Sequence, residues 1–243
     1  MLHARAALAA LFLALCACAS APPGKRLAAA EGFVLPDRGV AVLAVDAQLG
    51  RLTTRGHVAH DAALSEDAAD GLQDALLAAL RRDGVPARAA AFAPPGGDDP
   101  EAENARLRAL LALGDLRVVV HEAGLAPHRS ALAARPIAYP EALRAAAGAD
   151  HVLVAVASGT YATRNRRLAQ AAGTAMTVGV GVGYTPSSGG QYVVLGLYDL
   201  EADRLVWVHK DDFIRYSLRR EDDRARIAKQ LLAPLTEGAG DAE

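Results

Sequence analysis

Two histidines and an aspartate stand close together in the segment His57-Val-Ala-His60-Asp61. Imidazoles three residues apart on one helical turn, with a carboxylate beside them, could bind zinc or copper. The segment lacks the glutamate of an H-E-x-x-H motif, and a third ligand would have to come from a distant part of the chain. A polar loop before the next helix is the other interpretation. We therefore expect no metal site and no cofactor.

Ser158 follows a strongly apolar run and could be the nucleophile of a hydrolase. Such serines stand on a strand-to-helix elbow, commonly G-x-S-x-G, within reach of a histidine base. Ser158 has no glycine two residues before it or two residues after it, and either His121 or His151 would have to supply the base. We keep a hydrolase that uses Ser158 as an alternative and predict that the chain is not an enzyme.

Glycines alternate with valines in Gly179-Val-Gly-Val-Gly183. A dinucleotide loop needs a strand before it and a helix that opens on its third glycine, whereas loop residues follow here. The surrounding apolar stretch, residues 171–184, could be buried or could form a subunit contact. A membrane-spanning hairpin needs two strands of about 9 to 11 residues, and only one such run is present.

Both cysteines lie in the first twenty residues, MLHARAALAALFLALCACAS. Arg5 supplies a positive charge, and the apolar core at residues 6–15 is too short to span a bilayer, which is typical of a secretory signal. The end of this segment resembles the lipobox of bacterial lipoproteins, where a leucine stands three residues before the cysteine and a small residue directly before it. Cys18 fits this pattern, whereas Cys16 has Leu15 directly before it. The resemblance implies that Cys18 is lipidated and is the first mature residue.

The lipobox resemblance also implies where the protein works. A lipoprotein cysteine carries three acyl chains by family resemblance, which makes the anchor effectively permanent. Ala19-Ser20 follow Cys18, and the lack of an aspartate there resembles outer-membrane sorting in enteric-type bacteria. After cleavage no cysteine is left in the folded part, which excludes disulfides and thiolate metal sites.

The composition supports an aliphatic core and gives no sign of a nucleic-acid partner. Hydrophobic residues make up 52% of the chain, but aromatic residues only 5%. The net charge is −2, with acidic and basic residues interspersed, so no basic patch points to nucleic acid.

The first half of the chain alternates aliphatic runs with amphipathic segments. A helix is predicted to begin at the N-cap Ser65 and to end at Gly84. A second helix is predicted from Asp99-Pro100 to Gly114, with Leu107, Leu110 and Leu111 as its apolar face. Strands are predicted at residues 40–45, 85–92 and 116–121, the second of them weak.

The second half contains the strongest strand prediction, at residues 151–157, which a short helix within residues 136–148 precedes. Trp207, the sole tryptophan, is predicted to pack in the core, with an exposed interface anchor as the alternative. A hairpin of residues 192–198 and 204–210 follows, and then a helix from Glu221 with Ile227, Leu231, Leu232 and Leu235 on one face.

This order predicts an α/β sandwich of two or three layers, with a mixed parallel and antiparallel sheet and a late β-hairpin. The strand at Val40, "LRRDG" at residues 80–84, "AAAGADHVLVAVASG" at 145–159 and "VVLGLYDLEADRLVWVHK" at 193–210 carry a family resemblance. The chain resembles a superfamily of bacterial envelope lipoproteins that includes the curli secretion channel lipoprotein, the lipoprotein activators of penicillin-binding proteins and related uncharacterised lipoproteins. Their late hairpin has a Thr-Gly turn, which Ala202-Asp203 replaces here. The motifs are structural and imply the fold rather than a chemistry.

We therefore predict a signal peptide at residues 1–17, a tether at 18–37, a single α/β domain at 38–235 and a disordered tail at 236–243. The expected function is that of a membrane-anchored periplasmic lipoprotein, held by Cys18, that acts as a protein-interaction or assembly module in the bacterial envelope. Its expected partner is another envelope protein or a second copy of itself, and not nucleic acid. A component of an oligomeric secretion channel is a further alternative.

Overall fold

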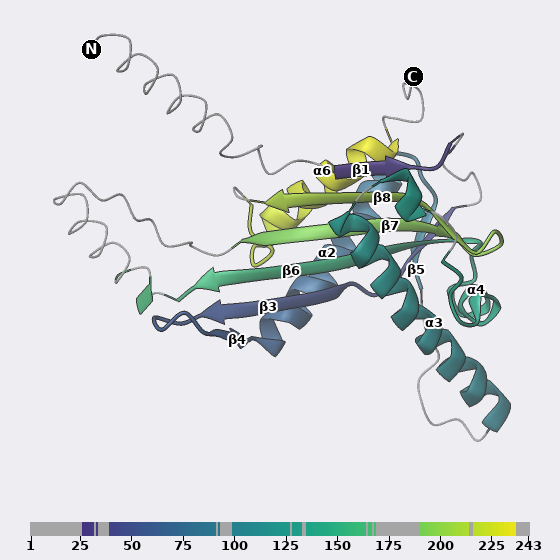
Figure 1. The fold of residues 1–243 in the computed structure, drawn as a ribbon, viewed down its shortest axis with the longest axis horizontal. Coiled ribbons are helices and arrows are strands. Elements are labelled where there is room, and N and C mark those ends of the chain that lie inside the picture. Colours follow the sequence, from purple (N-terminus) through teal and green to yellow (C-terminus); the bar gives the residue numbers. More distant parts are fainter. Residues whose placement is uncertain are drawn as a thin grey trace, which may run out of the picture.

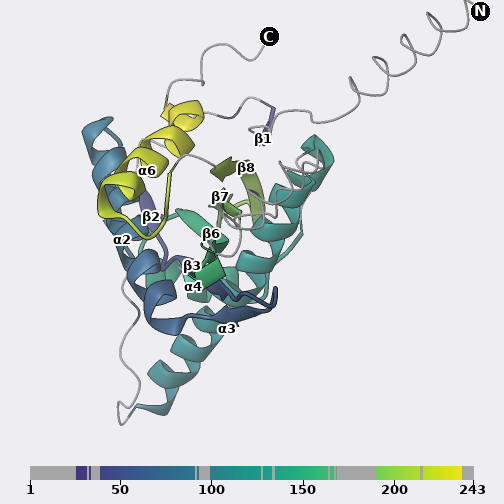
Figure 2. The ribbon, with the colours of Figure 1, turned by 90° about the vertical axis from the view of Figure 1, so that its left-hand side faces the viewer.

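The chain folds into a mixed β-sheet between two layers of helices, as Figures 1 and 2 show. The helices α2 (Ala62–Arg82) and α6 (Glu221–Thr236) cover one face, and α3 (Pro100–Leu125) and α4 (Pro140–Ala147) cover the other. The predicted α/β sandwich is confirmed, and it has three layers. The structure, a computed structural model, describes residues 26–31, 33, 39–90, 92, 99–126, 128–132, 135–163, 165–166, 168, 190–213 and 216–236.

Strand β6 (His151–Ala162) lies at the centre of the sheet. On one side it pairs antiparallel with β7 (Gln191–Asp199), then come β8 (Arg204–Phe213) and, at the edge, β1 (Arg26–Ala29). On its other side it pairs in parallel with β2 (Val40–Val42) at its start and β3 (Asp46–Leu52) at its end. Strand β5 (Ala87–Ala89) lies beside β2, and β4 (Val58–His60) forms a hairpin with β3.

The strands predicted at residues 151–157, 192–198 and 204–210 are confirmed as β6, β7 and β8. The clear signal of β6 has a physical cause. Residues 152–157 of β6 are buried throughout, because helices cover both faces of the sheet at its centre. A strand buried on both faces has a continuous apolar sequence rather than an alternating one. The predicted hairpin is formed by β7 and β8, which pair from residue 191 to residue 213.

The predicted strand at residues 116–121 is wrong, because α3 runs without interruption from Pro100 to Leu125. Leu116 and Val120 face the core and Val118 is exposed, which is helical spacing within what reads as one aliphatic run. Gly114 does not end the helix, and it has open space where a side chain would be. The predicted start is confirmed, since the Asp99 carboxylate accepts a hydrogen bond from the Glu101 amide at 2.9 Å.

Helix α2 begins four residues earlier than predicted, with Asp61 and not Ser65 as its N-cap. Ser65 is buried inside the first turn, where its hydroxyl donates to the Asp61 carbonyl at 2.7 Å and accepts from the Leu49 amide at 3.0 Å. The predicted end is confirmed, because Gly84 has a φ of 80°, which suits the residue after a helix.

Two strand pairings were not predicted. Strand β1 lies within residues 18–37, the predicted tether, and pairs with β8 so that Ala28 stands opposite Val208. The sheet therefore begins before the predicted domain boundary at residue 38. Strands β3 and β4 form a hairpin in the stretch between residues 46 and 60, where no strand was predicted.

Two glycines let α3 lie close against the sheet. A Cβ atom at Gly196 of β7 would stand 2.6 Å from a methyl group of Val120 on α3. In return, a Cβ atom at Gly124 of α3 would overlap Val194 of β7. Real Cβ atoms do not approach other heavy atoms this closely, so the two contacts define how α3 sits on β7.

Candidate functional site

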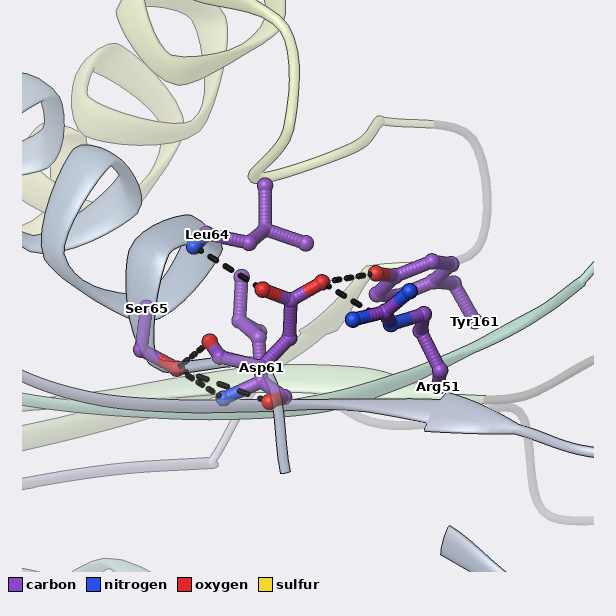
Figure 3. Close-up of polar contacts among 6 residues, drawn as sticks. Arg51, Asp61, Leu64, Ser65 and Tyr161 are labelled. Carbon is purple, nitrogen blue, oxygen red and sulfur yellow. Dashed lines mark hydrogen bonds and ion pairs between the residues drawn. The ribbon is translucent and has the colours of Figure 1, made fainter. Parts of the chain in front are cut away.

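The most connected polar cluster lies where β3, β6 and the start of α2 meet (Figure 3). The β3–β4 hairpin returns the chain to β3, so that the Asp61 amide donates to the Leu49 carbonyl at 2.9 Å. The Asp61 carboxylate then accepts from the Tyr161 hydroxyl at 2.5 Å and from the Leu64 amide at 3.3 Å. Arg51 forms an ion pair with the same carboxylate at 3.2 Å.

These contacts keep Asp61 charged and Tyr161 neutral. The hydrogen bonds from Tyr161 and Leu64 lower the pKa of Asp61, and the Arg51 guanidinium adds to the effect. Burial and the adjacent carboxylate raise the pKa of Tyr161. The guanidinium carbon of Arg219 lies 4.3 Å from the centre of the Tyr161 ring, so the segment before α6 also contacts the cluster.

The geometry of this cluster indicates a structural role, in which its groups hold parts of the fold together. Each group already has a partner, and the Asp61 carboxylate shares both its oxygens among Tyr161, Arg51 and the first turn of α2. The cluster joins four parts of the chain, namely β3, the start of α2, β6 and the segment before α6. The sequence signal for it was an aspartate directly before an amphipathic run, which predicts an N-cap but not its other partners.

The metal hypothesis for His57, His60 and Asp61 gains no support. The Asp61 carboxylate already binds Tyr161, Arg51 and the Leu64 amide. Both histidines are exposed. Within the described ranges, no three histidine, cysteine, aspartate or glutamate side chains are grouped as metal ligands. The loop interpretation holds only in part, because residues 58–60 form β4.

Ser158 has no catalytic geometry in the described part of the chain. His151 stands at the start of the same strand, seven residues and therefore about 23 Å away. His121 of α3 stacks on Tyr192, which is the register partner of Ser158, with ring centres 6.2 Å apart. No hydrogen bond joins Ser158 to either histidine among these residues, and the Nδ1 atom of His121 is buried with no hydrogen-bond partner.

Two hollows lie near the other end of β6. The larger, of about 570 Å³, is lined by Glu141, Arg144, Ala145, Gly148, Ala149 and Asp150, and the smaller, of about 240 Å³, by Gly39, Val40, Pro86, Ala87, Arg88 and Ala149. Arg144 and Asp150 face each other across 3.7 Å. Neither hollow is lined by Ser158 or a histidine.

Several predicted features fall outside the described residues. Cys18, the predicted lipidation site, is one of them, and the glycine-rich stretch at residues 171–184 is another. Trp207 is described, and it is fully buried against the α6 face of the sheet. The core interpretation of this tryptophan is therefore confirmed, and the exposed anchor is wrong.

The predicted apolar face of the second helix, Leu107, Leu110 and Leu111, is exposed in α3 and not buried. One side of this helix is buried on the sheet through Ala109, Ala112, Leu113, Leu116, Val120 and Ala123. The other side exposes Leu107, Leu110, Leu111, Val118 and Leu125, which we call the α3 stripe. Leu111 is 61% exposed and Val118 is 56% exposed. A helix that is apolar on two opposite sides has a weak periodic pattern of hydrophobic residues. This explains why the sequence predicted a helix followed by a strand where the structure has one helix.

The charged residues on either side of the α3 stripe are bound to their own chain. Glu122 forms an ion pair with Arg135, and the Arg117 guanidinium donates to the Ala44 carbonyl at 2.9 Å. Asp115 accepts from the Ala138 amide at 3.3 Å, and the Arg108 guanidinium lies 5.7 Å from the ring centre of Tyr139. These charges therefore border the stripe without interrupting it. None of the described helices is long and apolar enough to cross a membrane.

The fold and the α3 stripe together define a mixed α/β sandwich with an exposed apolar helix face. No protein-family model matches the chain, and no curated protein matches it. Two solved structures similar to the chain are PelC dodecamers from Paraburkholderia phytofirmans, at 13% and 14% identity and a TM-score of 0.40 for both. Each alignment covers 88% of this chain and 98% or 96% of the PelC chain. At this distance the comparison assigns no family to the chain.

Proposed function

We propose that this chain is a lipid-anchored periplasmic protein of the bacterial envelope that acts through protein–protein contacts and not through catalysis. The observation that carries the proposal is the α3 stripe, because several large aliphatic side chains exposed along one side of a helix are typical of an interaction site. The polar groups offer no competing chemistry. The Asp61 cluster is saturated by its own contacts, and Ser158 has no base within hydrogen-bond reach in the described residues.

The anchor is proposed from the lipobox resemblance at Cys18. Three acyl chains would hold the α/β domain at the membrane surface, where a weak contact between proteins gains from high local concentration. The residues that follow Cys18 support placement in the outer membrane.

The anchor is tested by labelling cells that produce the full chain with radioactive palmitate. Cys18→Ser should abolish the label and release the protein from the membrane fraction, whereas Cys16→Ser, two residues away, should keep both. Equal labelling of the two variants would contradict the assignment of Cys18. Separation of inner and outer membranes on a density gradient then tests the predicted location.

The interaction surface is tested with a photo-activated cross-linking amino acid placed singly in the full chain. At Leu111 we expect discrete protein adducts in the envelope of the cells that naturally make the chain. Val58, a 57% exposed valine on β4, is the matched control and should give none. Equal adducts at both positions, or none at Leu111, would contradict the proposal.

A further inference from the structure

We infer that the partner of the α3 stripe is the α3 stripe of a second copy of this chain, with the two helices parallel. This inference rests on the proposed function, because it names the partner of the same surface. Three observations carry it: the spacing of the stripe, the charges that border it and the glycine at its middle.

The outward side of α3 has the spacing of a coiled-coil seam. Leu107, Leu111, Gly114, Val118, His121 and Leu125 follow one another at alternate steps of four and three residues. Two helices with this repeat pack side chains into each other's gaps along a shared seam. The buried residues of α3 occupy the other positions of the repeat, so the seam, apart from His121, faces away from the chain's own sheet. From Leu107 to Leu125 it is about 27 Å long.

The bordering charges favour a second copy in the parallel orientation. In a parallel pair, a residue that flanks the seam on one helix lies beside a residue of the other helix whose number is five higher. Glu103, which also pairs with Arg106 of its own helix at 2.7 Å, then lies beside Arg108 of the second copy. Arg117 lies beside Glu122 of the second copy, and both pairs have opposite charge in addition to their contacts within the chain. An antiparallel pair would bring Arg108 beside Glu122, but it would also place Asp115 against Asp115 and Arg117 against Arg117. It would also set Leu111 against the polar His121.

Gly114 lets the two helices approach closely. In the chain itself nothing lies within 4 Å of the position where a Cβ atom would stand, so Gly114 has no packing role within the described residues. A glycine inside a helix is less favourable than an alanine at the same position. At the middle of a seam between two copies, its missing side chain gives room for the facing backbone. His121 adds little to the seam, because its ring is turned onto Tyr192 of β7.

The experiment uses single cysteines in the full chain, with its own signal and anchor. Under mild oxidation of intact envelopes, V118C should form a disulfide-linked species of twice the chain mass, because equivalent residues face each other in a parallel seam. V58C is the matched control, since Val58 and Val118 are the same residue type with almost equal exposure. The chain without substitutions controls for links through its native cysteines.

Linked dimers from V118C alone would support the inference. Linkage of V58C to the same extent would show random collision and overturn it. Linkage between L107C and L125C copies in place of V118C self-linkage would overturn the parallel orientation. A second measurement uses the purified anchored protein in detergent, where sedimentation should show dimers. Leu111→Glu should weaken their association by at least about 100-fold, because a charge would enter an apolar seam.

The same variants separate failure of this inference from failure of the proposed function. If V118C does not link to itself and the protein is monomeric, while the cross-linker at Leu111 captures a different protein, the second copy is ruled out and the interaction surface stands. If the cross-linker at Leu111 captures nothing in the envelope, both fail.

Discussion

Asp203 shows how one side chain can join two distant segments. Its φ of 47° lies in the left-handed region that glycine favours. Its carboxylate accepts from the hydroxyl of the buried Tyr198 at 2.6 Å and from the Ile137 amide at 3.3 Å. The Tyr198 hydroxyl also lies 3.1 Å from the Arg135 carbonyl. These bonds join the β7–β8 turn to the segment before α4.

Tyr198→Phe should therefore destabilise the fold by about 1 to 3 kcal/mol, because it removes the hydrogen bond that the Tyr198 hydroxyl donates to the Asp203 carboxylate. Urea unfolding followed by circular dichroism measures this change in the free energy of unfolding. Tyr139→Phe is the control, since Tyr139 is half exposed and should change stability little. Equal effects of the two substitutions would show that the Tyr198 hydrogen bonds add nothing specific.

Asp61 makes the stability of the fold depend on pH on the acid side. Its pKa is lowered in the folded state, so its contribution is present above the ordinary aspartate pKa of about 4 and is lost as the pH falls through the folded-state value. Asp61→Asn should flatten the fall in unfolding free energy between about pH 5 and pH 2. Urea titrations across this range test it. Asp74→Asn, at an exposed position on α2, should leave the slope as it is.

At the scale of elements, α3 shows most clearly how packing overrules local sequence. Its position on β7 depends on the paired contacts of Gly196 with Val120 and of Gly124 with Val194. Because the helix is held this close, its inner side is filled by alanine and medium-sized aliphatic residues. Its outer side keeps an apolar stripe that the sheet cannot reach.

Gly196→Val should destabilise the fold by about 1 to 3 kcal/mol, since the added methyl groups would force α3 away from the sheet. Gly114→Ala, on the helix that packs against Gly196, is the control, and it should stabilise the monomer by up to about 1 kcal/mol because nothing crowds that position. Thermal unfolding of both variants tests the pair of predictions. A neutral Gly196→Val would mean that α3 can shift without loss.

At the scale of the whole molecule, one side of α3 is buried on the sheet and the other side is exposed. Figure 2 shows α3 on the flank of the sheet opposite to α2 and α6. Among the described residues, no element of the chain covers the α3 stripe, so Leu111 and Val118 remain exposed. An interaction function is proposed for this reason, and the proposal depends on the arrangement of the entire sandwich.

This arrangement predicts opposite results for two similar substitutions on α3. Leu111→Glu should change the unfolding free energy of the monomer by no more than about 0.5 kcal/mol, because its side chain is exposed. Leu116→Glu should cost more than about 4 kcal/mol, because it buries an unpaired charge in the core. Urea unfolding at a protein concentration that keeps the chain monomeric compares them. Similar losses for both would show that the stripe is part of the monomer core.

The sequence alone determined the elements whose pattern is local and unambiguous. The continuous apolar run of β6, the two runs and short loop of the β7–β8 hairpin and the apolar face of α6 each indicate one structure, because a few neighbouring residues specify it. The sequence did not determine the roles of the predicted site residues. The three residues of the histidine segment suggested a metal site or a loop, and the structure instead uses Asp61 to hold Tyr161, one hundred residues away.

Only the tertiary structure decided the features that depend on contacts between distant segments. The pairing of β1 with β8 cannot be read from four residues, because an edge strand owes its conformation to its neighbour. The aliphatic run within α3 suits a strand or a helix equally well, and the fit of Gly196 and Gly124 against the facing valines decides for a helix. The α3 stripe follows from the same contacts, since a helix packed on one side of a sheet can bury only one of its two apolar sides.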